Sequence, residues 1–323
     1  MAASRNNPSS SLPARVAAFL ATQTRGDERL SVGLSGGCDS VVLVHILVEL
    51  GFGDRLDAIH VHHGLSPNAG RWATFCTDYC QRLGLACRVA HVEVERDSGL
   101  GLEAAARAAR YQVFSGMAAD ILLLGHHQGD QAETVLFNLL RGAGVTGAAA
   151  IPTDRRQGRL RILRPLLDVS RDEIEAYARA AQLEWIDDES NADTALSRNF
   201  MRHEVLTALA ERFPAAEKNL AQAASHFAEA DALLGELALV DWLAAADGEA
   251  LMLVKVREMS LPRLKNLLRH RLRQLGWQAP ATARLDEFAR QLRSAGPDRH
   301  PALDLAEGSI VAGQGRLRWI VRG

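Results

Sequence analysis

The fold of the first half of the chain is decided by one stretch of sequence: Val32-Gly33-Leu34-Ser35-Gly36-Gly37-Cys38-Asp39-Ser40-Val41-Val42-Leu43. Its first residues are typical of a buried strand, and the apolar run Val41–Leu50 predicts a helix. The two glycines between them let the backbone turn sharply and approach a ligand. Because free N–H groups at a helix start attract anions, the stretch predicts a phosphate site. An ordinary strand-to-helix turn is the alternative, since Ser, Gly and Asp are common in such turns.

Two widespread phosphate loops are excluded. A Walker A loop needs a lysine, and the chain has none before Lys218; the dinucleotide fingerprint GxGxxG is also missing from this stretch. The remaining pattern, Ser-Gly-Gly-x-Asp-Ser after a strand, resembles the PP-loop of the N-type ATP pyrophosphatases, which split ATP between its α- and β-phosphates. The resemblance implies an ATP site with Mg²⁺ held by Asp39. The residues that it assigns to ATP are Ser35, Gly36, Gly37, Cys38, Asp39 and Ser40.

Composition indicates an ordinary globular protein of two or three domains, with 323 residues, 47% of them apolar. The polar stretch Met1–Pro13 lacks the apolar core of a signal peptide, so we expect it to be frayed and the protein to be cytoplasmic. We expect no disulfide framework, and interpret the cysteines as small apolar fillers. They are Cys38, Cys76, Cys80 and Cys87, with no CxxC pair.

Strands alternate with helices over the first 140 residues. We expect strands at 30–34, 56–61, 87–94 and 121–124, and helices at 14–21, 41–50, 71–83, 102–118 and 131–140. This order predicts βαβ units with a parallel, Rossmann-type sheet. Ligands of such sheets bind at the carboxyl ends of the strands. Four polar segments are predicted there: 35–40, 62–64, 97–101 and 126–133.

The rest of the chain is predicted to be mostly helical. We expect a long loop at 141–161, helices at 171–181 (with Ser170 as N-cap), 198–212 and 215–245, and a domain boundary near Phe213. The last part is predicted to be a small α+β domain with a strand at 251–256, helices at 262–275 and 282–292, and short strands near its end. We therefore expect a catalytic ATP-binding domain at 1–213 and a smaller domain at 214–323.

A second motif follows the fourth predicted strand: Gly125-His126-His127-Gln128-Gly129-Asp130-Gln131-Ala132-Glu133-Thr134. Asp130 and Glu133 are three residues apart and so share one face of the predicted helix. Carboxylates at a helix start often only complement the helix dipole. Here the motif also lies at the same sheet edge as the Ser-Gly-Gly loop, which favours a joint site.

With these motifs in this order, the chain resembles the tRNA(Ile)-lysidine synthetases, a family of PP-loop enzymes. The matching pieces begin at Ser35, His60, Glu103, Gly125, Arg141, Arg164 and Asp188 and cover about the first two thirds of the chain. The resemblance implies that ATP adenylates the wobble cytidine of tRNA(Ile) with a CAU anticodon, and that free L-lysine then displaces AMP. Family members are often homodimers, and this chain resembles the shorter members, without the additional C-terminal domain.

The resemblance also implies roles for individual residues. Adenine would lie near His60–His63, including His62 and His63. Asp130 and Glu133 would hold Mg²⁺ and the lysine ammonium, with Asp39 and Asp130 as the metal ligands and a carboxylate as base. The remaining residues assigned to catalysis would contact the phosphates, the cytidine or the adenylated intermediate. They are Arg107, Arg110, His126, Arg198 and Arg202. Without the resemblance, arginines on an Ala-rich helix are ordinary surface residues.

One position departs from the family. Two adjacent aspartates usually precede Gln131, whereas this chain has Gly129 in the first position. We expect activity to survive because Asp130 and Glu133 keep their spacing. The alternatives are a tRNA-binding protein with a decayed site, a PP-loop tRNA thiolase, which would want a cysteine pair, and a small-molecule amide synthetase.

Two Arg-rich segments favour a nucleic acid as acceptor. Six arginines and one acid lie between Arg155 and Arg171, and seven basic residues and one acid lie between Lys255 and Arg273. A solvated basic surface is the alternative for each segment alone. The family resemblance implies that Lys255–Arg273 contacts the acceptor arm of the tRNA, largely through phosphates.

Overall fold

The computed structural model describes residues 11–95, 101–187, 197–296 and 299–322, which fall into two compact units, 1–228 and 229–323. Residues 97–100 of the polar segment expected at 97–101, and the acidic motif at 188–193, lie outside the described residues. The domain boundary expected near Phe213 falls at the end of α9 (Thr207–Arg212), before the unit division inside α10 (Ala216–Ala245). No helix in the described ranges is long and apolar enough to cross a membrane.

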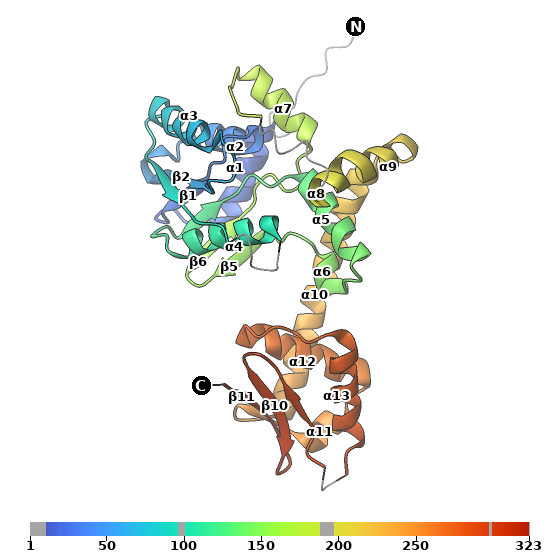
Figure 1. The fold of residues 1–323 in the computed structure, drawn as a ribbon. Helices are drawn as coiled ribbons and strands as arrows, with labels where there is room; N and C mark the ends of the chain where they lie inside the picture. Colours follow the sequence, from blue (N-terminus) through green and yellow to red (C-terminus); the bar gives the residue numbers. More distant parts are fainter. Residues whose placement is uncertain (1–10, 96–100, 188–196, 297–298, 323) are drawn as a thin grey trace. The chain divides into compact units, whose positions relative to one another are not determined.

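The first unit is built on a six-stranded sheet of order β3-β2-β1-β4-β6-β5 (Figure 1). The strands are β1 (Leu30–Gly33), β2 (Leu56–His62), β3 (Cys87–His91), β4 (Ile121–Leu123), β5 (Asp154–Gln157) and β6 (Leu160–Leu163). All neighbours pair in parallel except β5 with β6. The strand order reverses beside β1, so the segments that follow β1 and β4 meet at the switch point where such sheets bind ligands.

Helices cover both faces of this sheet: α1 (Leu12–Gln23), α2 (Cys38–Glu49), α3 (Ala69–Arg82), α4 (Leu102–Ser115) and α7 (Arg171–Ala180) (Figure 1). Three further helices lie to one side of the sheet: α5 (Gln128–Leu140), α6 (Val145–Ala148) and α8 (Ser197–Phe200). A π-helical segment, Met201–Leu206, joins α8 to α9. The predicted fold class, a parallel PP-loop-type sheet with helices, is confirmed.

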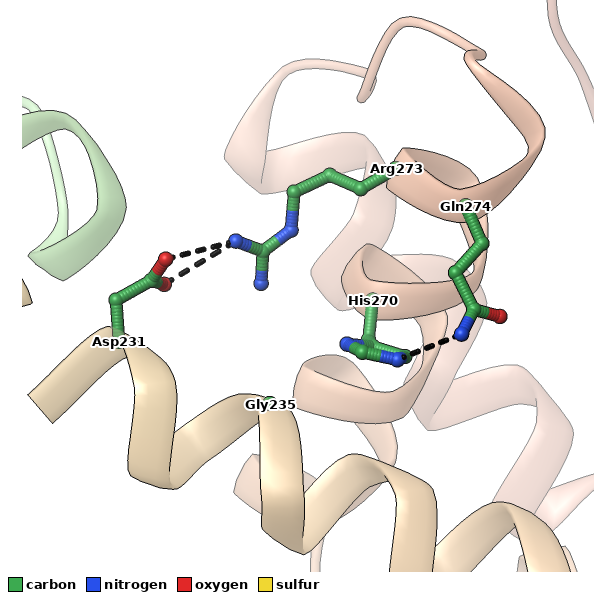
Figure 2. Close-up of a pocket in the computed structure, with 5 residues that line it drawn as sticks. All are labelled: Asp231, Gly235, His270, Arg273 and Gln274. Atoms are coloured by element: carbon green, nitrogen blue, oxygen red, sulfur yellow. Dashed lines mark hydrogen bonds and ion pairs between the residues drawn. The ribbon is translucent and has the colours of Figure 1, made fainter. Parts of the chain in front are cut away.

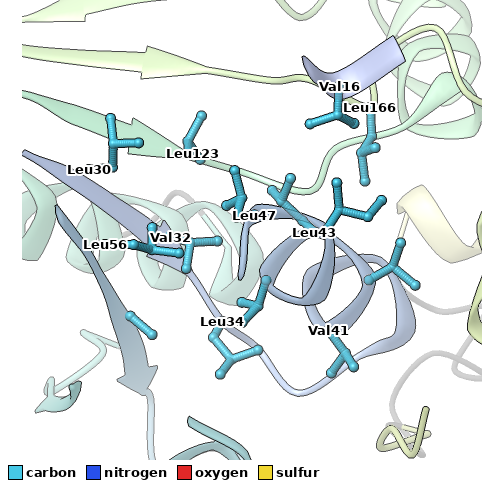
Figure 3. Close-up of a cluster of buried hydrophobic side chains, with 14 of the residues drawn as sticks. Val16, Leu30, Val32, Leu34, Val41, Leu43, Leu47, Leu56, Leu123 and Leu166 are labelled. Atoms are coloured by element: carbon cyan, nitrogen blue, oxygen red, sulfur yellow. The ribbon is translucent and has the colours of Figure 1, made fainter. Parts of the chain in front are cut away.

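Alternation along the strands assigns the helices to their faces. Ile121 and Leu123 of β4 point into the main core with α1, α2, α3 and α7 (Figure 3). Leu122 points the opposite way and packs with Phe114 of α4 and Ile162 of β6. Helix α2 is largely apolar because most of it lies within this core, with Val41–Val44 fully buried. This burial fixes the loop that precedes α2 against the sheet.

The long loop predicted at 141–161 is wrong in part, because the segment contains α6, the hairpin strand β5 and the start of β6. Strand β5 reads Asp-Arg-Arg-Gln and is largely exposed, so it lacks the apolar alternation that predicts a strand. Its partner β6 is buried but only four residues long. Gly158, with φ of 60°, makes the tight turn between them.

The second unit has a five-stranded antiparallel sheet of order β7-β8-β11-β10-β9. Its elements after α10 are β7 (Ala246–Asp247), β8 (Ala250–Met252), α11 (Leu253–Glu258), α12 (Leu261–Leu275), α13 (Thr282–Ser294), β9 (Ala302–Asp304), β10 (Gly308–Gly313) and β11 (Arg316–Val321). The strand expected at 251–256 is wrong beyond Met252. Leu253 and Val256 are three residues apart and both are buried, which is the spacing of a helix face.

Candidate active site

Hydrogen bonds of two serines, Ser35 and Ser40, fix the conformation of the loop after β1. Ser35 Oγ lies 3.1 Å from Ser40 Oγ and accepts a 3.2 Å hydrogen bond from the Gly37 backbone, while Ser40 Oγ donates to Gly37 O at 2.9 Å. Gly36 adopts φ of 93°, and a Cβ there would lie 2.7 Å from Ile186. No side chain caps α2, so the first N–H groups of this helix are available to an anion.

A second glycine brings the β4 segment to this loop. A Cβ on Gly125 would lie 3.0 Å from the carbonyl oxygen of Asp39 and 3.2 Å from the Ser40 nitrogen. Only a residue without a side chain lets the end of β4 pass so close to the start of α2. The helix that follows, α5, therefore begins beside the loop after β1.

Cys38 contributes only its backbone to the loop. Its side chain is 1% exposed, and burial raises the pKa of its thiol to about 11. A thiol with so high a pKa holds almost no thiolate at neutral pH, so it is unsuited to carry sulfur. The four cysteines are free thiols, in agreement with the prediction that there is no disulfide framework.

Asp39 faces an arginine and a histidine. Arg171 Nη1 donates to both of its carboxylate oxygens at 2.8 and 2.7 Å, and His127 Nε2 lies 3.9 Å away. Burial raises the pKa of Asp39 above its ordinary value, although His127 and Arg171 oppose this shift. Arg171 occupies the first position of α7, whose N-cap is Ser170, as predicted.

Asp130 closes a capping box with His127. The His127 backbone nitrogen donates to Asp130 Oδ2 at 2.9 Å, and the Gly129 nitrogen donates to His127 Nδ1 at 3.0 Å. His127 Nε2 is 3.8 Å from Asp130 Oδ2, so one imidazole lies between Asp130 and Asp39. Burial alone would raise the pKa of Asp130, but His127, His126 and the peptide N–H hold it below the ordinary value. Asp130 is therefore a fixed anion.

Glu133 behaves differently from Asp130. Its side chain is 2% exposed and accepts a 2.6 Å hydrogen bond from Arg202 Nε, while Arg202 Nη2 lies 3.5 Å from Asp130. Burial nevertheless raises the pKa of Glu133 above its ordinary value, because Arg202 offsets only part of the desolvation. The two carboxylates on one helix face thus differ in proton affinity, as an acid–base site requires.

Arg202 and Arg198 reach different partners. Arg202 contacts the carboxylates of α5, whereas Arg198 Nε pairs with Glu103 Oε1 of α4 at 3.0 Å. The π-helical segment begins at Met201, between the two arginines, and widens the helix there. Although Arg198 and Arg202 are four residues apart in a helical segment, they therefore have different acidic partners.

Several arginine side chains, together called the cationic group below, surround Tyr111 of α4. The guanidinium groups of Arg107 and Arg155 lie 5.0 and 5.2 Å from the ring centre, and Arg164 Nη2 donates to the hydroxyl at 3.3 Å. Burial lowers the pKa of Arg110, whose Nε is enclosed without a protein hydrogen bond. Buried positive charge with few acids is the chemistry of a site for an anionic ligand.

His126 belongs to the same cationic surroundings. Burial lowers the pKa of His126 to about 3, with Asp130 opposing the shift and Arg164 and Arg110 adding to it. Its Nδ1 is buried and has no protein hydrogen-bond partner. His126 is therefore neutral and can accept or donate one hydrogen bond to a bound group.

The three histidines at the end of β2 and just after it have different surroundings. His60 Nδ1 hydrogen bonds to Leu34 O at 2.9 Å inside the fold, which is a structural contact. The rings of His62 and His91 lie 4.5 Å apart. Burial lowers the pKa of His63 to about 4, with Arg110 adding to the shift, and its Nδ1 has no protein partner. His63 therefore lies within the electrostatic influence of Arg110.

The structure thus brings together the loop Ser35–Ser40 with Asp39, Asp130, Glu133 and Arg202, and places Arg107, Arg110, His126 and His63 beside them. Sequence reasoning counted Arg171 only as part of an Arg-rich segment and assigned no role to His127 of the second motif. The available signal was the position of each at a predicted helix start, His127 as the N-cap of α5 and Arg171 as the first residue of α7. No group of three metal-ligating side chains occurs in the described part of the chain. Asp39 and Asp130 are two carboxylates, which suits Mg²⁺ that takes its remaining ligands from phosphate and water.

The basic stretch of the second unit is largely neutralised. Arg271 lies 4.3 Å over Trp242, pairs with Glu249 at 2.8 Å and is only 17% exposed. Acidic partners also hold other basic residues of the stretch: Lys255 with Glu258, Arg263 with Asp241, Lys265 with Asp286 and Arg273 with Asp231. Arg269 has no ion pair within the described ranges. A pocket of about 380 Å³ between α10 and α12 is lined by Asp231, Gly235, His270, Arg273 and Gln274 (Figure 2).

Comparisons with known proteins agree with these features. Residues 8–209 match the model of the PP-loop domain, and residues 251–318 match the TilS substrate binding domain. The chain is 51% identical to the tRNA(Ile)-lysidine synthase of Aromatoleum aromaticum, covering 83% of this chain and 63% of that protein. It is 44% identical to that of Pseudomonas syringae pv. tomato, covering 97% and 72%.

The chain spans less than two thirds of the length of the first curated relatives that it matches. It is 43% identical to the synthase of Nitrosomonas europaea, and the match covers 87% of this chain and 62% of that protein. Among solved structures, the U34-tRNA thiolase NcsA from Methanococcus maripaludis shares the fold, with a TM-score of 0.55, 18% identity, and coverage of 68% of this chain and 78% of that one. The chain belongs to the PP-loop family and, within it, to the tRNA(Ile)-lysidine synthases.

Proposed function

We propose that the chain ligates free L-lysine to the wobble cytidine of a tRNA(Ile) with a CAU anticodon, using ATP. The observation that carries the proposal is the meeting of three features at one sheet edge. They are an uncapped helix start after β1, a carboxylate pair of unequal pKa on α5, and a buried cationic group on α4.

In the first step, ATP lies with its phosphates on Ser35–Ser40. The cytosine O2 attacks the α-phosphorus, the bond to the β-phosphate oxygen breaks, and pyrophosphate leaves. Asp39 and Asp130 would hold Mg²⁺, which neutralises phosphate charge when bound. Arg107 and Arg110 face the developing phosphate charge. His62 and His63 lie near the adenine in this arrangement.

In the second step, the lysine ε-amine attacks cytosine C2 and the bond to the AMP oxygen breaks. The amine must lose its protons, and Glu133 is the suited base because its pKa is raised while Arg202 fixes its position. Asp130, held as an anion, attracts the ammonium form of the substrate. His126 and Arg198 flank the adenylated cytidine.

The test uses the purified chain with ATP, labelled lysine and tRNA(Ile) bearing a CAU anticodon. Lysine-dependent label on the tRNA, together with equal amounts of AMP and pyrophosphate, supports the proposal. Binding of tRNA without transfer would instead favour a degenerate site, which Gly129 suggests. Lysine-independent incorporation of sulfur would favour a thiolase, against which the buried thiol of Cys38 argues.

We also propose that two copies associate. Helix α10 exposes four large apolar side chains within the second unit: Leu233, Leu239, Val240 and Leu243. Their spacing places three of them, Leu233, Val240 and Leu243, along one side of the helix. Sedimentation equilibrium should give twice the chain mass, and Leu243→Glu should shift it toward the monomer.

A further inference from the structure

Gly129 leaves room for a carboxylate from a distant part of the chain. A Cβ on Gly129 would lie 3.1 Å from Glu217 Oε1 and 2.8 Å from His127 Cε1. The backbone of Gly129 does not adopt positive φ, so its conformation does not require glycine. The missing side chain therefore matters for space, and Glu217 of α10 fills part of that space.

Glu217 differs from the other carboxylates of the site in its partners. Arg171 holds Asp39, a peptide N–H holds Asp130, and Arg202 holds Glu133. Within the described residues, no hydrogen bond or ion pair engages the half-buried carboxylate of Glu217. A cation that enters the site can bind Glu217 without breaking an existing pair.

The position of Glu217 also fits a substrate group. Its oxygen and the His127 ring both lie within 3.1 Å of the point that a Cβ on Gly129 would occupy, and the ring faces Asp130 and Asp39. A side chain at residue 129 would place its own terminal atoms in the same small volume, because Cβ and the carboxylate oxygens of an aspartate are about 2.4 Å apart by standard bond lengths. The chain thus supplies from α10 a negative charge that α5 itself lacks at this point.

We propose that Glu217 binds the ammonium group of the lysine substrate and that Gly129 is the glycine that admits it. This inference rests on the proposed function and deepens it. Glu217 is a binding residue here, since it contacts the substrate cation and not the reacting carbon. The loss of one charge-assisted hydrogen bond weakens binding about tenfold or more.

The experiment compares Glu217→Gln with the unmodified chain. We expect the KM for lysine to rise about tenfold, with no change in the ATP–pyrophosphate exchange that reports adenylation. Glu211→Gln, which alters an exposed glutamate of α9, is the matched control and should leave both values unchanged. If the unmodified chain transfers no lysine, the proposed function fails; if it does and Glu217→Gln keeps the same KM, only this inference fails.

A second variant tests the position of the charge. Gly129→Asp combined with Glu217→Gln moves the carboxylate back to α5 and should lower the KM for lysine toward that of the unmodified chain. A KM that stays at the value of Glu217→Gln would overturn the claim that the two residues share one place. A change in the Mg²⁺ dependence of adenylation, with an unaltered KM for lysine, would also overturn it, because the bound cation would then be the metal.

Discussion

Replacement of Arg202 by methionine tests the inference that the two carboxylates on α5, Asp130 and Glu133, differ in proton affinity. The variant keeps the aliphatic stem but removes the guanidinium that donates to Glu133 at 2.6 Å and lies 3.5 Å from Asp130. Breaking a fully buried ion pair costs about 3–5 kcal/mol, and one hydrogen bond to a charged group about 1.5–3 kcal/mol. Because the Arg202 side chain is 38% exposed, water screens part of the pair and the lower range applies.

We therefore expect the free energy of unfolding to fall by about 2 kcal/mol at pH 8, which corresponds to a drop in Tm of about 4–8 °C for a unit of this size. The effect depends on pH through Glu133. The folded pKa of Glu133 lies above its unfolded value, near 4.5. Such a carboxyl contributes fully to the stability of the protein below the unfolded pKa, and this contribution is lost as the pH rises through the folded pKa. The loss in Arg202→Met should shrink as the pH falls, because protonation removes the Glu133 charge that Arg202 balances.

Thermal unfolding at pH 5 and pH 8, followed by circular dichroism, measures this difference. Arg212→Met is the control, since Arg212 is exposed at the end of α9 and lies outside the site. Equal stability of Arg202→Met and the unmodified chain at pH 8 would refute the reasoning. A loss that is the same at both pH values would refute the claim that the Glu133 charge is its cause.

Two further predictions concern the loop and the second unit. Gly36→Ala should weaken ATP binding at least tenfold in a binding titration, because residues with a Cβ rarely adopt φ of 93° and the loop would have to change its conformation; unchanged affinity would contradict this dependence on glycine. Arg271→Ala should lower the Tm of the chain, because it removes the stacking of the guanidinium on Trp242. Arg269→Ala should leave the Tm unchanged and weaken tRNA binding in a salt-dependent manner. The reverse pattern would exclude a structural role for Arg271.

Sequence patterns predicted the parts of the fold in which burial and periodicity agree. The strand–loop–helix unit around Ser35–Ser40 and the capped start of α7 at Ser170 appear as expected. Strand β5 was missed because none of its residues is apolar, so only its pairing with β6 identifies it. Patterns that depend on local composition cannot report a pairing made by a neighbour in space.

The site could be predicted less fully than the fold. Spacing placed Asp130 and Glu133 on one face of a helix, but did not show that one carboxyl is held as an anion and the other has a raised pKa. That difference depends on burial and on Arg202, which comes from a helix far away in sequence. Glu217 had no signal at all, since only the three-dimensional fold brings α10 to Gly129.

The polar strand β5 has a consequence for how copies of the chain meet. A parallel sheet that ended at β6 would present unpaired N–H and C=O groups on a buried, apolar strand, which is a template for aggregation. Strand β5 covers that edge in antiparallel pairing, and it carries two exposed arginines, Arg155 and Arg156, which point to opposite faces of the strand. Like charges on this margin disfavour growth of one sheet into that of another copy, so self-association is directed to other surfaces.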